Sequence, residues 1–99
     1  MPTYRFGPYR LDEAEHRLTC DGERVALTPK AFDTLVALVE RAGRLVEKDE
    51  ILRTVWPEAV VEEGNVAHNV SVLRKALGGG RTDQAYIETV PTRGYRFVA

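Results

Sequence analysis

The chain has 99 residues, of which 43% are apolar and 29% are charged, and its formal net charge is −1. This length fits one domain with a single core, and the composition is that of a globular rather than a disordered protein. No apolar run approaches the roughly 20 residues of a transmembrane helix, and the single cysteine, Cys20, excludes an internal disulfide. We also expect no signal peptide. We therefore expect one domain over residues 1–99, in a reducing compartment.

The N-terminal segment, residues 3–27, has the pattern of short strands. Apolar and polar side chains alternate over residues 4–11, with an interruption at Gly7-Pro8. Two further short segments flank Asp21-Gly22, a pair that is typical of a two-residue hairpin turn because both residues accept positive φ. The pattern predicts an antiparallel sheet of three or four strands.

A three-helix core is expected over residues 28–78. Thr28 and Pro29 are suited to the N-cap and the first position of a helix that ends near Gly43. Its inward face comprises Phe32, Leu35, Val36 and Val39.

The second helix should run from about Lys48 to Trp56, where Pro57 stops it, and Glu47 is a poor cap for it. Its inward residues are Ile51, Leu52, Val55 and Trp56. A loop over residues 57–63 follows, and we expect Val60 and Val61 to pack inward, although a small exposed patch for a partner is the alternative.

The third helix carries the most informative pattern. Gly64 to Thr82 contains no acidic residue, although the chain has 15 Asp and Glu. At about 100° per residue, Val66, Val70, Leu73 and Leu77 form one apolar stripe. The opposite face comprises Asn65, His68, Ser71, Val72 and Lys75, with Asn69 and Arg74 on its flanks. Soluble faces usually mix both signs of charge, whereas a face against phosphates excludes carboxylates. We expect the helix over residues 65–77, closed by Gly78-Gly79-Gly80, to enter a DNA groove.

The distribution of charge supports this expectation despite the net charge of −1. Residues 1–63 hold 9 basic and 13 acidic side chains, a balance of −4. Residues 64–99 hold 5 basic and 2 acidic side chains, a balance of +3. Affinity for phosphate depends on the local patch rather than on the sum over the chain.

The C-terminal segment, residues 85–98, reads as a β-hairpin. Tyr86–Val90 and Tyr95–Val98 flank the turn Pro91-Thr92-Arg93-Gly94. Pro91 presets φ and Gly94 is expected to be left-handed, so that Thr92 and Arg93 point outward. Three helices followed by a hairpin predict an α+β winged helix-turn-helix, with the third helix in the major groove and a wing at residues 90–95 on the minor groove or the backbone.

The segments LTPKAFDTLVALVERAGRLVEKDEILRTVWPE, VEEGNVAHNVSVLRKALGG and YIETVPTRGYRFVA resemble the C-terminal effector domain of OmpR/PhoB-type transcription regulators. The resemblance runs from about Tyr4 to Phe97, and LRKALG and TRGYRF are its most specific pieces. It implies a cytoplasmic, bacterial-type domain that binds double-stranded DNA, often as head-to-tail pairs on direct repeats. It also implies that the loop over residues 57–64 can contact RNA polymerase.

The resemblance also assigns roles to single positions. It places Trp56, Asn69, Ser71 and Arg74 at phosphates, Ala67, His68 and Val72 at bases, and Thr89 and Arg93 in the wing. Asn65, Lys75 and Thr92 complete the expected DNA-binding set from the outer face and the hairpin tip. Arginine is common among the relatives where this chain has Ser71, Val72 and Pro91, so we expect weaker and less salt-sensitive binding per monomer.

We expect Met1 to be the initiator and no receiver module to precede the domain, an arrangement similar to ToxR/CadC-like regulators. Any sensing domain would then follow Ala99, which leaves open that the chain is a fragment of a larger or membrane-anchored regulator.

Less specific interpretations accompany these assignments. Trp56 fits a core-edge residue better than a phosphate contact, and His68 and Arg93 could each be simple solvated side chains. A winged-helix module that binds protein instead of DNA would need large apolar residues on the outer face, where only Val72 qualifies. Cys20 with His16 or His68 lacks a third metal ligand, and Gly78–Arg81 lacks the Gly-Lys-Ser/Thr ending of a phosphate loop. We expect no catalytic residues, metal, cofactor or small-molecule substrate.

Overall fold

The computed structural model describes residues 3–78 and 86–98. The expected glycine stop at Gly79 and Gly80, and residue 85 at the start of the expected hairpin segment, lie outside these ranges. In the described part, no helix is long and apolar enough to cross a membrane.

Four antiparallel strands form the N-terminal sheet, the upper end of the predicted number. They are β1 (Thr3–Phe6), β2 (Tyr9–Asp12), β3 (Arg17–Cys20) and β4 (Glu23–Val25), in the order β1-β2-β3-β4. The predicted tight turn joins β3 to β4, with φ of 51° at Asp21 and 86° at Gly22. Alternation along the strands buries Leu11 and Leu18 on the face toward the helices.

The three helices are α1 (Pro29–Glu40), α2 (Lys48–Val55) and α3 (Gly64–Ala76). Thr28 caps α1 as predicted, since its Oγ1 accepts a hydrogen bond from Ala31 N at 3.3 Å. The end of α1 was predicted too late, because the C-cap is Arg41 and Gly43 lies two residues beyond it. Glu47 is the N-cap of α2 and makes no side-chain capping bond, which confirms the weak cap.

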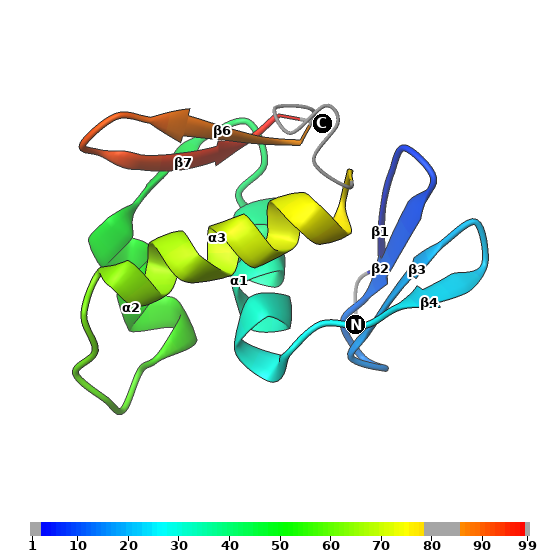
Figure 1. Ribbon diagram of the computed structural model, residues 1–99, viewed down its shortest axis with the longest axis horizontal. Coiled ribbons are helices and arrows are strands. Elements are labelled where there is room, and N and C mark those ends of the chain that lie inside the picture. Colours follow the sequence, from blue (N-terminus) through cyan, green and yellow to red (C-terminus); the bar gives the residue numbers. More distant parts are fainter. Residues whose placement is uncertain (1–2, 79–85, 99) are drawn as a thin grey trace.

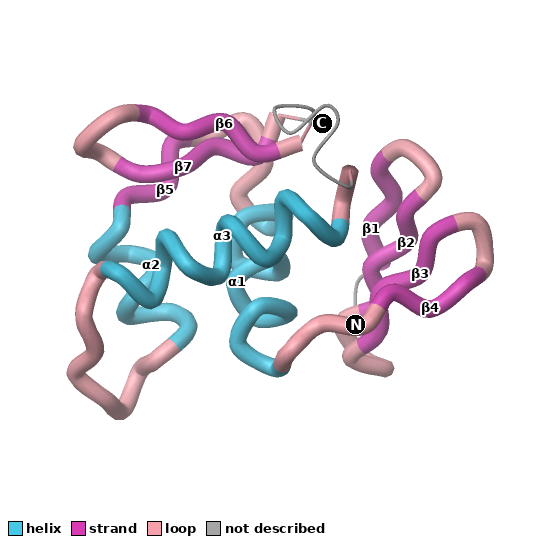
Figure 2. The backbone as a smooth tube through the Cα atoms, in the orientation of Figure 1, coloured by secondary structure: helices cyan, strands magenta, loops and turns pink. Residues whose placement is uncertain are grey.

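A second sheet contains the wing and one strand that the sequence did not reveal. β5 (Leu45–Glu47) pairs with β7 (Gly94–Phe97), which also pairs with β6 (Ile87–Val90), in the order β5-β7-β6 (Figure 2). A strand of three residues has no visible period of its own. It exists because its backbone pairs with a strand more than 40 residues away.

The wing turn corrects one prediction. The left-handed residue is Thr92, with φ of 64°, rather than Gly94. Gly94 is needed for a different reason: a Cβ at this position would collide with the carbonyl oxygen of Val46, because β5 and β7 approach closely there.

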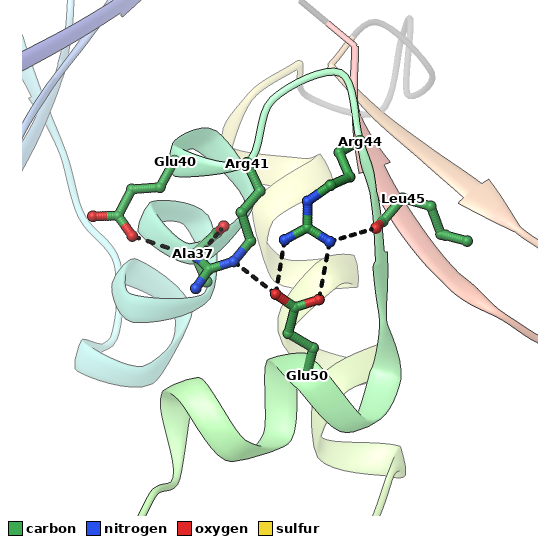
Figure 3. A network of polar contacts seen from close by, with 6 residues as sticks. All are labelled: Ala37, Glu40, Arg41, Arg44, Leu45 and Glu50. Atoms are coloured by element: carbon green, nitrogen blue, oxygen red, sulfur yellow. Dashed lines mark hydrogen bonds and ion pairs between the residues drawn. The ribbon is translucent and has the colours of Figure 1, made fainter.

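The core lies around α1, which packs against α2 and α3. Figure 1 shows the N-terminal sheet at one end of the longest axis, the loop between α2 and α3 at the other end, and the wing alongside α3. The ring centroids of Phe6 and Phe97 are 5.0 Å apart, so an aromatic contact joins the two sheets. An ion-pair network of Arg41, Arg44 and Glu50 joins the end of α1 to α2 (Figure 3).

Candidate nucleic-acid interface

The outer face of α3 carries no carboxylate, as predicted, but Lys75 is its one exposed basic side chain, because Arg74 is half-buried. Val66, Val70 and Leu73 are buried against the core. The exposed side chains of the helix are those of Asn65, Ala67, His68, Ser71 and Lys75. Val72 is half-buried and packs against the core, so it presents less surface than expected. The exposed side chains of α3 therefore include hydrogen-bonding groups and one cation, the Lys75 ammonium, but no carboxylate.

Asn69 does not lie on the flank of this face. Only 6% of it is exposed, and its Nδ2 donates to Thr34 Oγ1 on α1 at 3.4 Å. Thr34 Oγ1 in turn donates to the carbonyl oxygen of Lys30 at 2.8 Å. Asn69 lies on the same side of α3 as Val66 and Val70, the side that packs against the helical core. Its amide therefore joins α3 to α1.

Arg74 is directed at the wing instead of outward. Its Nη2 donates to the carbonyl oxygen of Ile87 at 2.9 Å and to Thr89 Oγ1 at 2.7 Å, both on β6. Its Nε is buried and has no hydrogen-bond partner in the described part of the chain. Two predicted site residues, Arg74 and Thr89, are thus brought into direct contact with each other.

The wing tip is exposed and cationic, as predicted. Thr92 and Arg93 are both exposed. Arg93 Nη2 lies 3.4 Å from Glu47 Oε2, and the backbone oxygen of Arg93 accepts a bond from Lys48 N at 3.2 Å. Lys48 Nζ is 3.5 Å from Glu63 Oε1, at the residue before α3. The tip, the start of α2 and the start of α3 therefore form one continuous surface.

Trp56 is the C-cap of α2 and packs, half-buried, at the edge of the core. Lys30 Nζ lies 5.8 Å from its ring centroid and donates to the carbonyl oxygen of Val55 at 2.8 Å. This placement fits the core-edge interpretation of Trp56.

The following loop departs from the prediction, because Val60 is fully exposed instead of packed inward. Val61 is half-buried. The two valines border an open cavity of about 360 Å³ whose other walls include Leu52, Arg53 and Ala59.

Within residues 3–78 and 86–98, no three His, Cys, Asp or Glu side chains gather in a way that could hold a metal ion. The exposed polar side chains of α3 and of the wing tip are donors, acceptors and cations, and the Glu47 carboxylate lies 3.4 Å from the Arg93 guanidinium. This surface can bind a polyanion such as a phosphate backbone.

Comparison with known families decides what kind of domain this is. Residues 22–97 match the family model described as "Transcriptional regulatory protein, C terminal". The chain belongs to this family, the OmpR/PhoB-type DNA-binding domains.

Individual relatives agree with this assignment. The transcriptional activator CadC of Escherichia coli is 31% identical over 99 residues, which is 99% of this chain and 19% of CadC. Among solved structures, the response regulator DrrB of Thermotoga maritima, an OmpR/PhoB homolog, has a TM-score of 0.88 at 31% identity and covers 98% of this chain and 44% of DrrB. The Klebsiella pneumoniae RstA DNA-binding domain, in complex with the RstA box, has a TM-score of 0.84 at 30% identity, with coverage of 99% and 98%. These matches confirm the predicted winged helix-turn-helix, and the chain spans about a fifth of the length of CadC.

This OmpR/PhoB-type domain has a second basic surface, which sequence reasoning missed. Strand register aligns Arg5 with Arg10, Arg10 with Thr19, and Thr19 with Arg24 across the N-terminal sheet. All three arginines are exposed, on the face opposite to the buried Leu11 and Leu18. Residues 1–63 have a net charge of −4, so their composition did not indicate a basic surface. The row forms because strand pairing brings together side chains that are far apart in the sequence.

Proposed function

We propose that the domain binds double-stranded DNA in a sequence-dependent manner to regulate transcription. In this proposal α3 lies in the major groove, and the wing over residues 90–95 contacts the adjacent minor groove or backbone. The observation that carries it is the acid-free outer face of α3, which is continuous with the exposed cation of the wing tip. Ala67, His68 and Val72 face base edges. Asn65, Ser71 and Lys75 meet the backbone, while Thr92 and Arg93 contact DNA from the wing.

Four of the expected contact residues receive a supporting role in this proposal. Arg74 and Thr89 hold the wing at a fixed angle to α3, because their side chains bond to each other. Asn69 sets the position of α3 on α1 through Thr34. Trp56 supports the end of α2 at the core edge. Their substitution therefore affects DNA binding through the arrangement of the contacting elements.

The domain is further proposed to bind direct repeats as head-to-tail pairs. The N-terminal sheet and the loop between α2 and α3 lie at opposite ends of the longest axis (Figure 1). The sheet carries the exposed row of Arg5, Arg10 and Arg24, and the loop carries the exposed Glu58, Glu62 and Glu63. Opposite charges at opposite ends favour a head-to-tail contact between copies. The longest extent of the molecule, 35 Å, is close to one turn of B-DNA, roughly 34–36 Å. Neighbouring copies on such repeats would then meet end to end.

The loop of the outermost copy would remain free, and we propose it as the surface for RNA polymerase. The fully exposed Val60 beside the open cavity supports a protein contact there. The domain is proposed to act in the cytoplasm, without catalysis.

A protein-binding module without DNA affinity is the competing function. It would place large apolar side chains on the outer face of α3. In the described part of the chain the exposed large apolar residues are Val60 and Val98, and neither lies on α3. This observation favours DNA.

Fluorescence anisotropy with a labelled duplex of random sequence, at low salt, separates the two functions. The DNA-binding domain gives saturable binding that weakens steeply as salt is added. If the folded domain shows no binding at the lowest salt, the DNA proposal is wrong and the protein-binding module gains support.

A further inference from the structure

A carboxylate lies directly beside the cation proposed to contact DNA from the wing. Glu47 Oε2 is 3.4 Å from Arg93 Nη2, and both side chains are 58% exposed. The main chains are joined as well, because Glu47 is the register partner of Gly94 and Lys48 N donates to the oxygen of Arg93. The backbone therefore fixes Glu47 next to the wing tip, while the two side chains meet in solvent.

The side chain of Glu47 does not cap α2, although the residue stands at the N-cap position. It is the N-cap residue of α2, with φ of −73° and ψ of 154°, yet its side chain makes no bond to the helix. Serine, threonine, aspartate or asparagine at this position would accept a bond from the first turn. The residue at this position instead directs a charge at Arg93.

The contact between the two side chains is loose. Elsewhere in the same sheet, Arg96 Nη1 lies 2.6 Å from Glu88 Oε1, and between the segment after α1 and helix α2, Arg44 Nη2 lies 2.8 Å from Glu50 Oε2. A single exposed contact at 3.4 Å is too weak to hold Arg93 in one orientation. It can be exchanged readily for another anion.

We propose that Glu47 competes with DNA phosphate for Arg93 and thereby lowers the affinity of the wing for any duplex. A phosphate in contact with Arg93 lies close to the Glu47 carboxylate, because both anions contact the same guanidinium. The two anions therefore repel each other. Binding therefore replaces one anionic partner of Arg93 by another and leaves Glu47 uncompensated. This inference rests on the proposed contact between Arg93 and DNA.

The opposite role for Glu47 would be to orient Arg93 toward DNA. The two roles predict opposite signs for the removal of the charge. A competitor that is neutralised lets the duplex bind more tightly, whereas a lost positioning residue makes binding weaker. The sign of the change in affinity therefore decides between them.

The test compares Glu47→Gln, Glu47→Ser and Arg93→Gln with the wild type by anisotropy titration over a salt series. Removal of one anion has the effect of one added cation, so Glu47→Gln should bind a random duplex about five- to tenfold more tightly near 0.1 M salt, with a salt slope steeper by about 0.9. Glu47→Ser should tighten binding to a similar extent and also raise the melting temperature, because serine can cap α2. Arg93→Gln should weaken binding.

Glu88→Gln is the matched control. Glu88 pairs with Arg96 on the face of the hairpin opposite to Thr89, which contacts α3, so this change should leave DNA affinity as in the wild type. If Arg93→Gln weakens binding but Glu47→Gln does not tighten it, the competition is wrong and the wing contact stands. If Arg93→Gln binds like the wild type, the wing contact itself is wrong and the inference falls with it.

Discussion

Arg74 Nη2 donates to Thr89 Oγ1 at 2.7 Å, and this bond joins the proposed recognition helix α3 to the wing strand β6. The same nitrogen also reaches the carbonyl oxygen of Ile87 at 2.9 Å. The Arg74 side chain was expected to contact phosphate, but it is hydrogen-bonded within the protein instead. We expect the angle between the two proposed DNA-contacting elements to depend on this arginine.

Arg74→Ala should therefore lower the free energy of unfolding by about 1–3 kcal/mol, because hydrogen bonds to a charged group are lost and the oxygen of Ile87 loses its donor. Urea denaturation measures the change. Thr89→Val removes one of the same bonds without removing a charge, so it should reproduce part of the loss. A fully stable Arg74→Ala variant with a reduced salt slope would show that the arginine acts at phosphate instead.

Lys75→Ala should have the contrasting effect. Lys75 is exposed, so stability should change by less than about 0.5 kcal/mol. The slope of log K against log salt should fall by about one unit, because one phosphate contact is lost.

Arg93→Ala should cost more affinity than Lys75→Ala, most of all where the flanking sequence is A·T-rich and the minor groove is narrow. Equal losses on all flanks would remove the wing from its proposed role.

Val72→Ala should relax base preference at one position, at a cost of about 1 kcal/mol for the preferred duplex, if its methyl groups pack on a thymine. Because Val72 also packs against the core, the variant's stability must be measured in parallel. An unchanged base preference in a stable variant would contradict the assignment.

Stability should depend on pH through Glu50. Hydrogen bonds from Arg44 and from Arg41, with their charges, hold the pKa of Glu50 below its ordinary value, against a smaller opposing effect of burial. A carboxyl group whose pKa is lowered by folding stabilises the protein above its unfolded pKa, and the contribution is lost as the pH falls through the folded pKa. Glu50→Gln should therefore destabilise by about 0.5–1 kcal/mol at pH 7, and by progressively less as acid protonates the wild-type group. A loss that does not change with pH would contradict this account.

Head-to-tail pairing can be tested by reversal of charge. Arg10→Glu with Arg24→Glu should abolish cooperative binding to a duplex with two direct repeats, while a single site is bound as before. Glu58→Arg with Glu62→Arg, combined with the first pair, should restore cooperativity, since the contact then has the opposite polarity. Cooperativity that survives the first pair of changes would exclude this interface.

Much of the fold could be predicted from local signals. Thr28-Pro29, the Asp21-Gly22 turn and the apolar stripe of α3 each specify structure within a few residues, and all three predictions were confirmed. The fold class followed because these elements occur in the order of a winged helix-turn-helix.

The errors at β5, Gly94, Asn69 and Arg74 involve contacts between distant segments. β5 forms only because β7 lies beside it, and Gly94 is constrained by Val46 rather than by the turn. Periodicity could assign Asn69 and Arg74 to a flank of α3 but could not show that α1 and β6 fill the space beside them. The row of arginines on the N-terminal sheet likewise depends on strand register.

Sequence-dependent DNA binding by α3 together with the wing can be tested by selection of bound duplexes from a random pool. The wild type should enrich one motif, and His68→Ala, which changes an exposed residue of α3, should enrich a motif altered at one position while Lys75→Ala leaves the motif intact. A pool that shows no enrichment with the folded wild-type domain would contradict sequence-specific binding.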